Sequence, residues 1–143
     1  MNQFENTQVP KYPIRMVAKK LNLSSHTLRM YERAGLLLPY KKETRHRLYS
    51  DEDIRRVEFI MKAIREDKLN IEGVRRLMAL LPCWDIKPCS QKRRDKCLAV
   101  QEYKHPCWML GETLGPQKTR ECRNCRVYYQ SIENIFQLKT YMK

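Results

Sequence analysis

The sequence predicts a mainly α-helical protein of two parts, a helical N-terminal part and a small cysteine-rich module. Three observations support this fold class. Apolar residues recur at helical spacing as far as Leu81, with good capping residues between the runs. All six cysteines follow, within residues 83–125. The composition also changes at Pro82, where we place the boundary between residues 14–81 and residues 82–143.

The first elements of the N-terminal part are a flexible arm and two helices. Residues 1–13 are polar and end in two prolines, so they are expected to form the arm. The first helix is predicted to begin at Ile14 and to end at about Leu21. Ser24 is a good N-cap for a second helix, and Gly35 favours its termination. Two helices joined by so short a turn are typical of a helix-turn-helix.

The segment after the second helix favours a short basic β-hairpin. It extends from Pro39 to Tyr49, where Leu48 and Tyr49 have strand-forming side chains. The turn has no Asn-Gly or Asp-Gly pair, the usual two-residue hairpin signal. We therefore expect a wing of basic character whose turn is unusual.

Two further helices complete the N-terminal part. Ser50 caps the third helix, whose first turn is acidic, as the helix dipole favours. Its predicted buried residues are Ile54, Val57, Met61 and Ile64. Asn70 caps the fourth helix, which carries Val74, Leu77, Met78 and Leu81 on one face and ends before Pro82. Four helices and a hairpin in this order make a winged helix-turn-helix.

The charge of the chain favours an anionic partner. The formal net charge is +13, which attracts nucleic acid first and an anionic membrane surface second. The excess is spread along the chain, with 17 basic and 10 acidic side chains in residues 1–81. No apolar run approaches the ~20 residues of a membrane span. The N-terminus does not resemble a secretory signal, so we expect a cytoplasmic protein without a membrane segment.

The second helix and the hairpin carry the candidate DNA contacts. The N-terminal part of a recognition helix enters the major groove. Arginine can bind guanine or phosphate there, and a tyrosine hydroxyl can reach a phosphate. Any one of these residues could be ordinary solvated surface, but the set in this order favours DNA. The candidates are Ser25, His26, Thr27, Arg29, Tyr31, Lys41, Arg45 and Arg47.

This combined pattern resembles the MerR family of transcription regulators. Residues 24–37 resemble its recognition helix, residues 47–54 the end of its wing and the start of its third helix, and residues 70–77 its fourth helix. The form is nearest the heat-shock-repressor branch. The resemblance implies a homodimer that binds an inverted repeat in double-stranded DNA, with RNA polymerase as a further candidate partner. It also implies that Arg29, Tyr31 and Arg47 are the main DNA contacts.

The chain departs from this family pattern in three places. Met30-Tyr31 stands where many members have two tyrosines, and Thr44-Arg45-His46 stands where many have an Asn-Gly turn. The long dimerising helix that usually follows the fourth helix is replaced by Pro82 and the cysteine-rich segment. The mode of dimerisation therefore does not carry over from the family.

The cysteines predict a metal site, and its metal is left open. Clustered cysteines in a reducing compartment are metal ligands or redox thiols more often than disulfides. Zinc held by four of them is the leading interpretation, an iron–sulfur cluster is the alternative, and plain thiols are the third. Pro82-Cys83-Trp84 recurs as Pro106-Cys107-Trp108, which resembles a small module with paired Cys-Trp motifs. The candidate ligands are Cys83, Cys89, Cys97, Cys107, Cys122 and Cys125.

Two other classes of function compete with a DNA-binding regulator. One is a thiol oxidoreductase that uses the pair Cys122 and Cys125. This pair lacks the βαβ setting of a redox CxxC, and no other catalytic motif is present, so we expect no enzyme. The other is an adaptor whose helix-turn-helix binds a protein partner instead of DNA.

Overall fold

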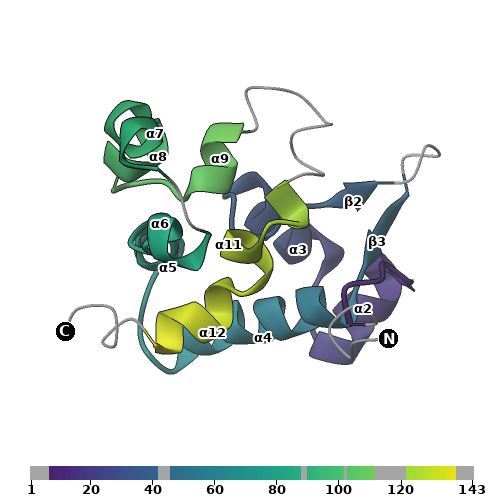
Figure 1. Cartoon of the computed structure of the whole chain (residues 1–143). Coiled ribbons are helices and arrows are strands. Elements are labelled where there is room, and N and C mark those ends of the chain that lie inside the picture. Colours follow the sequence, from purple (N-terminus) through teal and green to yellow (C-terminus); the bar gives the residue numbers. More distant parts are fainter. Residues whose placement is uncertain (1–6, 42–45, 88–89, 102, 112–121, 138–143) are drawn as a thin grey trace. The chain divides into compact units, whose positions relative to one another are not determined.

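The computed structural model describes residues 7–41, 46–87, 90–101, 103–111 and 122–137 (Figure 1). The chain divides into two compact units, Met1–Ile71 and Glu72–Lys143. Helix α5 (Ile71–Ala79) therefore lies almost entirely in the second unit, although the sequence placed the boundary later, at Pro82. No helix among the described residues has the length and apolar character that crossing a membrane requires.

The first unit contains the predicted helix-turn-helix. Helix α2 (Ile14–Leu21) ends at Asn22, which adopts a left-handed conformation with φ of 55°. Helix α3 (Ser25–Arg33) follows after a short turn. The turn is held by the backbone N–H of Leu23, which donates to the carbonyl of Ala18 at 2.9 Å. After α3 the chain turns at Gly35, whose φ of 77° is a conformation that glycine adopts without a steric penalty.

The wing belongs to a three-stranded antiparallel sheet. Strands β2 (Tyr40–Lys41) and β3 (Arg47–Tyr49) form the predicted hairpin. Strand β1 (Tyr12–Pro13) pairs with the other edge of β3, which gives the order β1-β3-β2. The residues of β1 were assigned to the flexible arm, because two residues, one of them a proline, carry no recognisable strand pattern. The hairpin turn, residues 42–45, lies outside the described residues.

Helix α4 (Asp51–Arg65) begins with a complete capping box. The backbone N–H of Asp53 donates to Ser50 Oγ at 3.1 Å, and that of Ser50 donates to Asp53 Oδ2 at 2.8 Å. The buried face of α4 is wider than predicted. Ile54 and Val57 are buried as expected, but Ile60, Ala63 and Arg56 are buried too, whereas Met61 and Ile64 are only half-buried. The face is centred nearer Ile60 than the predicted stripe, as a turn of 3.6 residues allows.

The segment between α3 and the wing lies in the core of the first unit. Leu36, Leu37 and Leu38 are completely buried. Arg56 of α4 is also buried, with 3% of its surface exposed, and its Nε donates to the carbonyl of Leu36 at 2.6 Å. A buried guanidinium needs such partners, because burying a charge without compensation is costly. This contact fixes α4 to the segment that leads into the wing.

The second unit is built from short helices. After α5 they are α6 (Cys83–Ile86), α7 (Gln91–Lys96), α8 (Leu98–Gln101), α9 (Cys107–Gly111), α11 (Arg126–Tyr129) and α12 (Ser131–Phe136). The single C-terminal helix predicted from Val127 onward is two helices, which meet at Gln130. Trp108 and Tyr128 are buried and pack edge to face, with ring centroids 5.2 Å apart.

Candidate nucleic-acid interface

Helix α3 has one exposed face and one buried face. His26, Arg29 and Arg33 are exposed, and their spacing of three and four residues puts them on the same side of the helix. Leu28 is fully buried on the other side. Two of these exposed residues, His26 and Arg29, were predicted contacts, and the sequence analysis missed Arg33. The helical spacing from Arg29 could have identified it.

Arg29 is one of the two exposed arginines of this face and can bind an anion. Within the part of the chain that the structure describes, its guanidinium makes no hydrogen bond or ion pair with another side chain. A guanidinium offers five N–H donors in a planar fork that matches a phosphate or the edge of a guanine. Arg29 therefore has its full donor capacity available to an external ligand.

The start of α3 is stabilised by its own polar side chains. The backbone N–H of Thr27 donates to Ser24 Oγ at 3.0 Å, and the two hydroxyl oxygens lie 2.9 Å apart. Ser25 and Thr27, both predicted contacts, lie in this first turn and are half-buried. The cap therefore fixes the part of the helix that a major groove would receive.

Tyr31 corrects one prediction, because its side chain does not reach outward. It is buried with 5% of its surface exposed, and this burial raises the pKa of its hydroxyl. Tyr31 follows Leu28 by three residues and so lies on the core side of α3. The ring is therefore part of the core, and the phosphate contact that the family resemblance implies for its hydroxyl stays a prediction.

Glu32 connects the candidate recognition helix to the wing. Its carboxylate is buried, with 7% of the residue exposed. Arg47 Nε on β3 lies 2.7 Å from Glu32 Oε2, and the Tyr49 hydroxyl on the same strand donates to Glu32 Oε1 at 2.6 Å. Burial and the hydrogen bond to Glu32 raise the pKa of Tyr49 far above its ordinary value. Two bonds to one carboxylate hold α3 and β3 in a set geometry.

This arrangement changes the interpretation of Arg47. The sequence presented it as a DNA contact of the wing. In the structure its Nε is engaged with Glu32 while 28% of the Arg47 side chain is exposed, and the DNA contact stays a prediction. Glu32 itself was missed, although an acidic residue inside an otherwise basic helix was a usable signal. Of the other wing candidates, Lys41 is the second residue of β2 and Arg45 lies outside the described residues.

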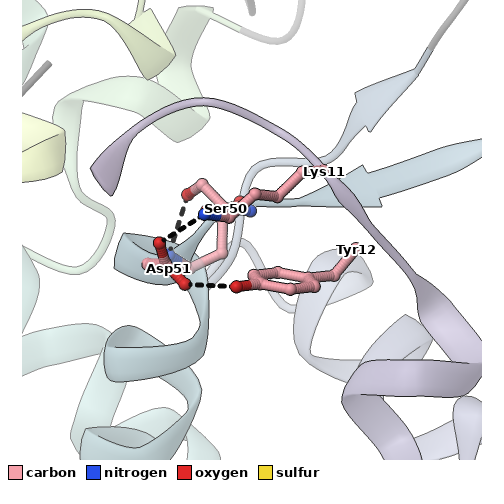
Figure 2. Close-up of polar contacts among 5 residues, drawn as sticks. Lys11, Tyr12, Ser50 and Asp51 are labelled. Atoms are coloured by element: carbon pink, nitrogen blue, oxygen red, sulfur yellow. Dashed lines mark hydrogen bonds and ion pairs between the residues drawn. The ribbon is translucent and has the colours of Figure 1, made fainter. Parts of the chain in front are cut away.

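A second polar contact anchors the opposite edge of the sheet. Figure 2 shows Lys11 and Tyr12 beside Asp51, the first residue of α4. Lys11 Nζ lies 3.0 Å from Asp51 Oδ2, and the Tyr12 hydroxyl donates to Asp51 Oδ1 at 2.8 Å. The hydrogen bond from Lys11 and, to a smaller extent, that from Tyr12 lower the pKa of the Asp51 carboxyl. The contact attaches strand β1 to the start of α4.

Burial perturbs one cysteine of the second unit, Cys107. Cys107 is deeply buried at its thiol, and this burial, together with nearby Cys83, Cys125, Cys122 and Cys97, raises the pKa of Cys107 to about 12. All five are half-buried as residues. No three Cys, His, Asp or Glu side chains in the described ranges are arranged to hold a metal ion. Cys89, the sixth predicted ligand, lies outside those ranges.

The first unit and α5 match a known family. Residues 12–81 match the model of the MerR HTH family of regulatory proteins. Over 62 residues the chain is 47% identical to the HTH-type transcriptional regulator AdhR of Bacillus subtilis (strain 168), covering 43% of this chain and 44% of the relative. Over 80 residues it is 32% identical to the putative heat shock protein HspR of Streptomyces coelicolor, covering 55% of this chain and 53% of the relative.

The match is confined to part of each protein. The chain spans about half the length of the curated relatives it matches. Among solved structures, HiNmlR, a MerR family regulator lacking the sensor domain and bound to promoter DNA, aligns over 92% of this chain and 90% of its own. That alignment has 18% identity and a TM-score of 0.42, too low to support a conclusion. Residues 12–81 therefore form a helix-turn-helix domain of the MerR type, similar to the domains of known transcription regulators.

Proposed function

We propose that the protein is a sequence-specific DNA-binding transcription regulator of the MerR type. The observation that carries the proposal is the exposed face of α3, where Arg29 is available to an anion at a helix that is capped and held to the wing. The family match and the relative's name as a transcriptional regulator support it. The net charge of +13 supplies the long-range attraction to DNA.

The geometry suggests how the first unit would read DNA. The first turn of α3 enters the major groove, and Arg29 binds a base edge or a phosphate there. Helix α2 adds Arg15, Lys19 and Lys20, all exposed, as candidate phosphate contacts. Glu32 fixes the angle between α3 and β3. The wing would therefore contact the DNA backbone beside the major groove only when α3 lies in that groove. Arg47 acts as a positioning residue in this scheme.

A homodimer completes the proposal. One recognition helix reads only a few base pairs, and a two-fold pair of helices reads an inverted repeat with half-sites about one helical turn apart. The protein would act on DNA in the cytoplasm, with RNA polymerase as the partner that its binding recruits or blocks.

The first test measures DNA affinity for the face of α3. The wild type is used to select DNA from a random pool, and fluorescence anisotropy then measures Kd for selected and scrambled duplexes. Arg29→Ala should weaken binding to the selected duplex by about 1–3 kcal/mol, or roughly 5- to 150-fold, and reduce discrimination. Lys62→Ala is the matched control, because it removes one exposed positive charge from α4 without touching α3.

Either of two results would overturn the proposal. Equal affinity for selected and scrambled DNA would mean that the protein binds DNA only through non-specific charge attraction. Equal losses for Arg29→Ala and Lys62→Ala would mean that α3 is not the reading element. No measurable DNA affinity at low salt would instead favour a helix-turn-helix that binds a protein.

A further inference from the structure

We propose that Arg33 binds a phosphate of the DNA backbone and contributes affinity that does not depend on base sequence. The inference rests on the proposed function, because it assigns a role on the same face of α3. It divides that face between Arg29, which can reach a base edge, and Arg33, which lies about one turn nearer the C-terminal end of the helix. The position, the backbone and the charge of Arg33 carry the argument.

Arg33 lies on the same side of α3 as the other two exposed residues of the helix. With about 3.6 residues per turn, successive side chains are about 100° apart, so His26, Arg29 and Arg33 fall within an arc of about 60°. The buried residues Leu28 and Tyr31 lie on the opposite side. A surface that receives Arg29 therefore also faces Arg33.

The distance along the helix axis places the two arginines beside different parts of the DNA. A rise of about 1.5 Å per residue puts Arg33 about 6 Å from Arg29, toward the C-terminal end of α3. A recognition helix directs its N-terminal residues at base edges in the major groove. In that orientation the C-terminal end lies nearer the phosphates that border the groove, so Arg33 is placed to contact a phosphate.

The backbone around Arg33 is held in place. The N–H of Gly35 donates to the carbonyl of Glu32 at 3.0 Å. The N–H of Leu36, which is fully buried, donates to the carbonyl of Tyr31 at 3.1 Å. These two carbonyls at the end of α3 therefore have backbone donors and do not need the Arg33 side chain as a cap. The Arg33 side chain consequently extends from a fixed point on the first unit.

The charge of Arg33 is available to an external anion. Its guanidinium makes no hydrogen bond or ion pair with another side chain in the ranges that the structure describes. The adjacent acid, Glu32, is buried and already bound to Arg47 and Tyr49. A cation in the last turn of a helix also interacts favourably with the helix dipole. The test therefore has to separate a stabilising role in α3 from a contact with DNA.

The test compares Arg33→Ala and Arg33→Lys with the wild type in the full chain. Fluorescence anisotropy measures Kd for selected and scrambled duplexes over a range of salt concentrations. Arg33→Ala should weaken binding to both duplexes by the same factor. It should also reduce the slope of log K against log salt concentration by about 0.9 for each protomer bound. Arg33→Lys should keep the wild-type values, because an ammonium can replace a guanidinium on a phosphate but not in a two-bond contact with guanine.

A second measurement locates the contact on the DNA. Single uncharged methylphosphonates replace the phosphates of the duplex one at a time. At the position that Arg33 contacts, the replacement should weaken binding by the wild type and have no further effect on Arg33→Ala. A variant whose α3 is merely less stable would instead respond to every replacement as the wild type does. Lys62→Ala, which removes an exposed charge from α4, is the matched control and should show this wild-type response.

Three results would overturn the inference. One is an unchanged affinity and salt slope in Arg33→Ala. Another is a loss confined to the selected duplex, which would make Arg33 a base contact. The third is a loss in Arg33→Lys as large as that in Arg33→Ala.

The result for Arg33 can be distinguished from the result for the regulator function. A phosphate contact can be measured on either duplex, so a wild type that binds both duplexes equally and loses affinity in Arg33→Ala contradicts only the regulator function. A wild type that prefers the selected duplex but is unaffected by Arg33→Ala contradicts only the role given to Arg33. A wild type without measurable DNA affinity contradicts both.

Discussion

Glu32 shows how one buried carboxylate organises the candidate interface. It accepts from Tyr49 and pairs with Arg47, and both partners lie on β3 of the wing. A carboxylate in a low-dielectric environment interacts strongly with its partners, and losing one side of such a pair leaves an uncompensated charge. The angle between the recognition helix and the wing therefore depends on one residue that never has to touch DNA.

Replacing Glu32 by alanine should destabilise the first unit by about 3 kcal/mol, because it leaves the Arg47 charge and the Tyr49 hydroxyl without their acceptor. Urea unfolding followed by circular dichroism measures the change. Glu52→Ala is a suitable control, because it removes a carboxylate that pairs with the exposed Arg55 three residues away, and it should cost less than about 1 kcal/mol. Equal costs for the two variants would contradict the role given to Glu32.

The side chains of Tyr31 and Arg47 both make contacts within the protein. Both residue types bind phosphate, and both positions matched a DNA-contacting pattern, so sequence reasoning placed them at the interface. The structure buries Tyr31 and engages Arg47 with Glu32. Residue type and order predict which elements would approach DNA, but the direction of each side chain depends on how α3 packs.

The helix caps were predictable because they are local. Ser24 and Ser50 were predicted as N-caps, and both accept the expected backbone hydrogen bonds. A cap involves residues within four positions along the chain, so its signal survives without tertiary information. Strand β1 had no such signal, because its two residues become a strand only by pairing with β3.

Replacing Ser50 by alanine should cost about 1 kcal/mol, because it removes the acceptor for the Asp53 N–H at the start of α4. Chemical unfolding of the full chain provides the measurement. Ser25→Ala is the matched control, since Ser25 is inside α3 and is not a cap, and it should change stability by less than about 0.5 kcal/mol. An equal loss in both variants would argue against the capping box.

The attachment of β1 to α4 should depend on pH. The pKa of Asp51 is lowered by Lys11 and Tyr12, so its contribution to stability is present above its ordinary pKa of 3.8 and is lost as the pH falls through its folded-state value. Tyr12→Phe should lower stability by about 1 kcal/mol or less at neutral pH, because the contact is only partly buried.

The measurement compares urea midpoints of the wild type and Tyr12→Phe at neutral pH and near pH 3. The difference should shrink as Asp51 becomes protonated. Tyr103→Phe, which removes a hydroxyl from an exposed ring in the second unit, should show no pH-dependent difference. A difference for Tyr12→Phe that stays constant with pH would exclude Asp51 as its partner.

At the scale of the whole molecule, charge should govern DNA affinity. Each phosphate neutralised by a lysine or arginine contributes about −0.9 to the slope of log K against log salt concentration. A chain with a net charge of +13 should therefore lose affinity steeply as salt rises, for selected and scrambled duplexes alike. Anisotropy titrations over a range of salt concentrations measure the slope. A flat dependence would contradict phosphate contacts as the source of affinity.

The sequence by itself determined the four helices of the N-terminal part, the Ser24 and Ser50 caps, the strands of the hairpin, the MerR-type pattern and the cysteine-rich segment after Pro82. These features are local, since a cap, a helical stripe or a spacing of cysteines is complete within a short stretch of chain. The sequence alone did not distinguish the six cysteines from one another. It also did not distinguish the exposed residues of the candidate recognition helix from the buried ones.

Only the tertiary structure decided which side chains meet. It buried Tyr31, shifted the core face of α4 toward Ile60 and joined Glu32 to residues of β3. It also buried the thiol of Cys107, which raises the pKa of that thiol. The physical reason is common to all of them: burial and pairing depend on the packing of elements that are distant along the chain, and no local pattern encodes that distance.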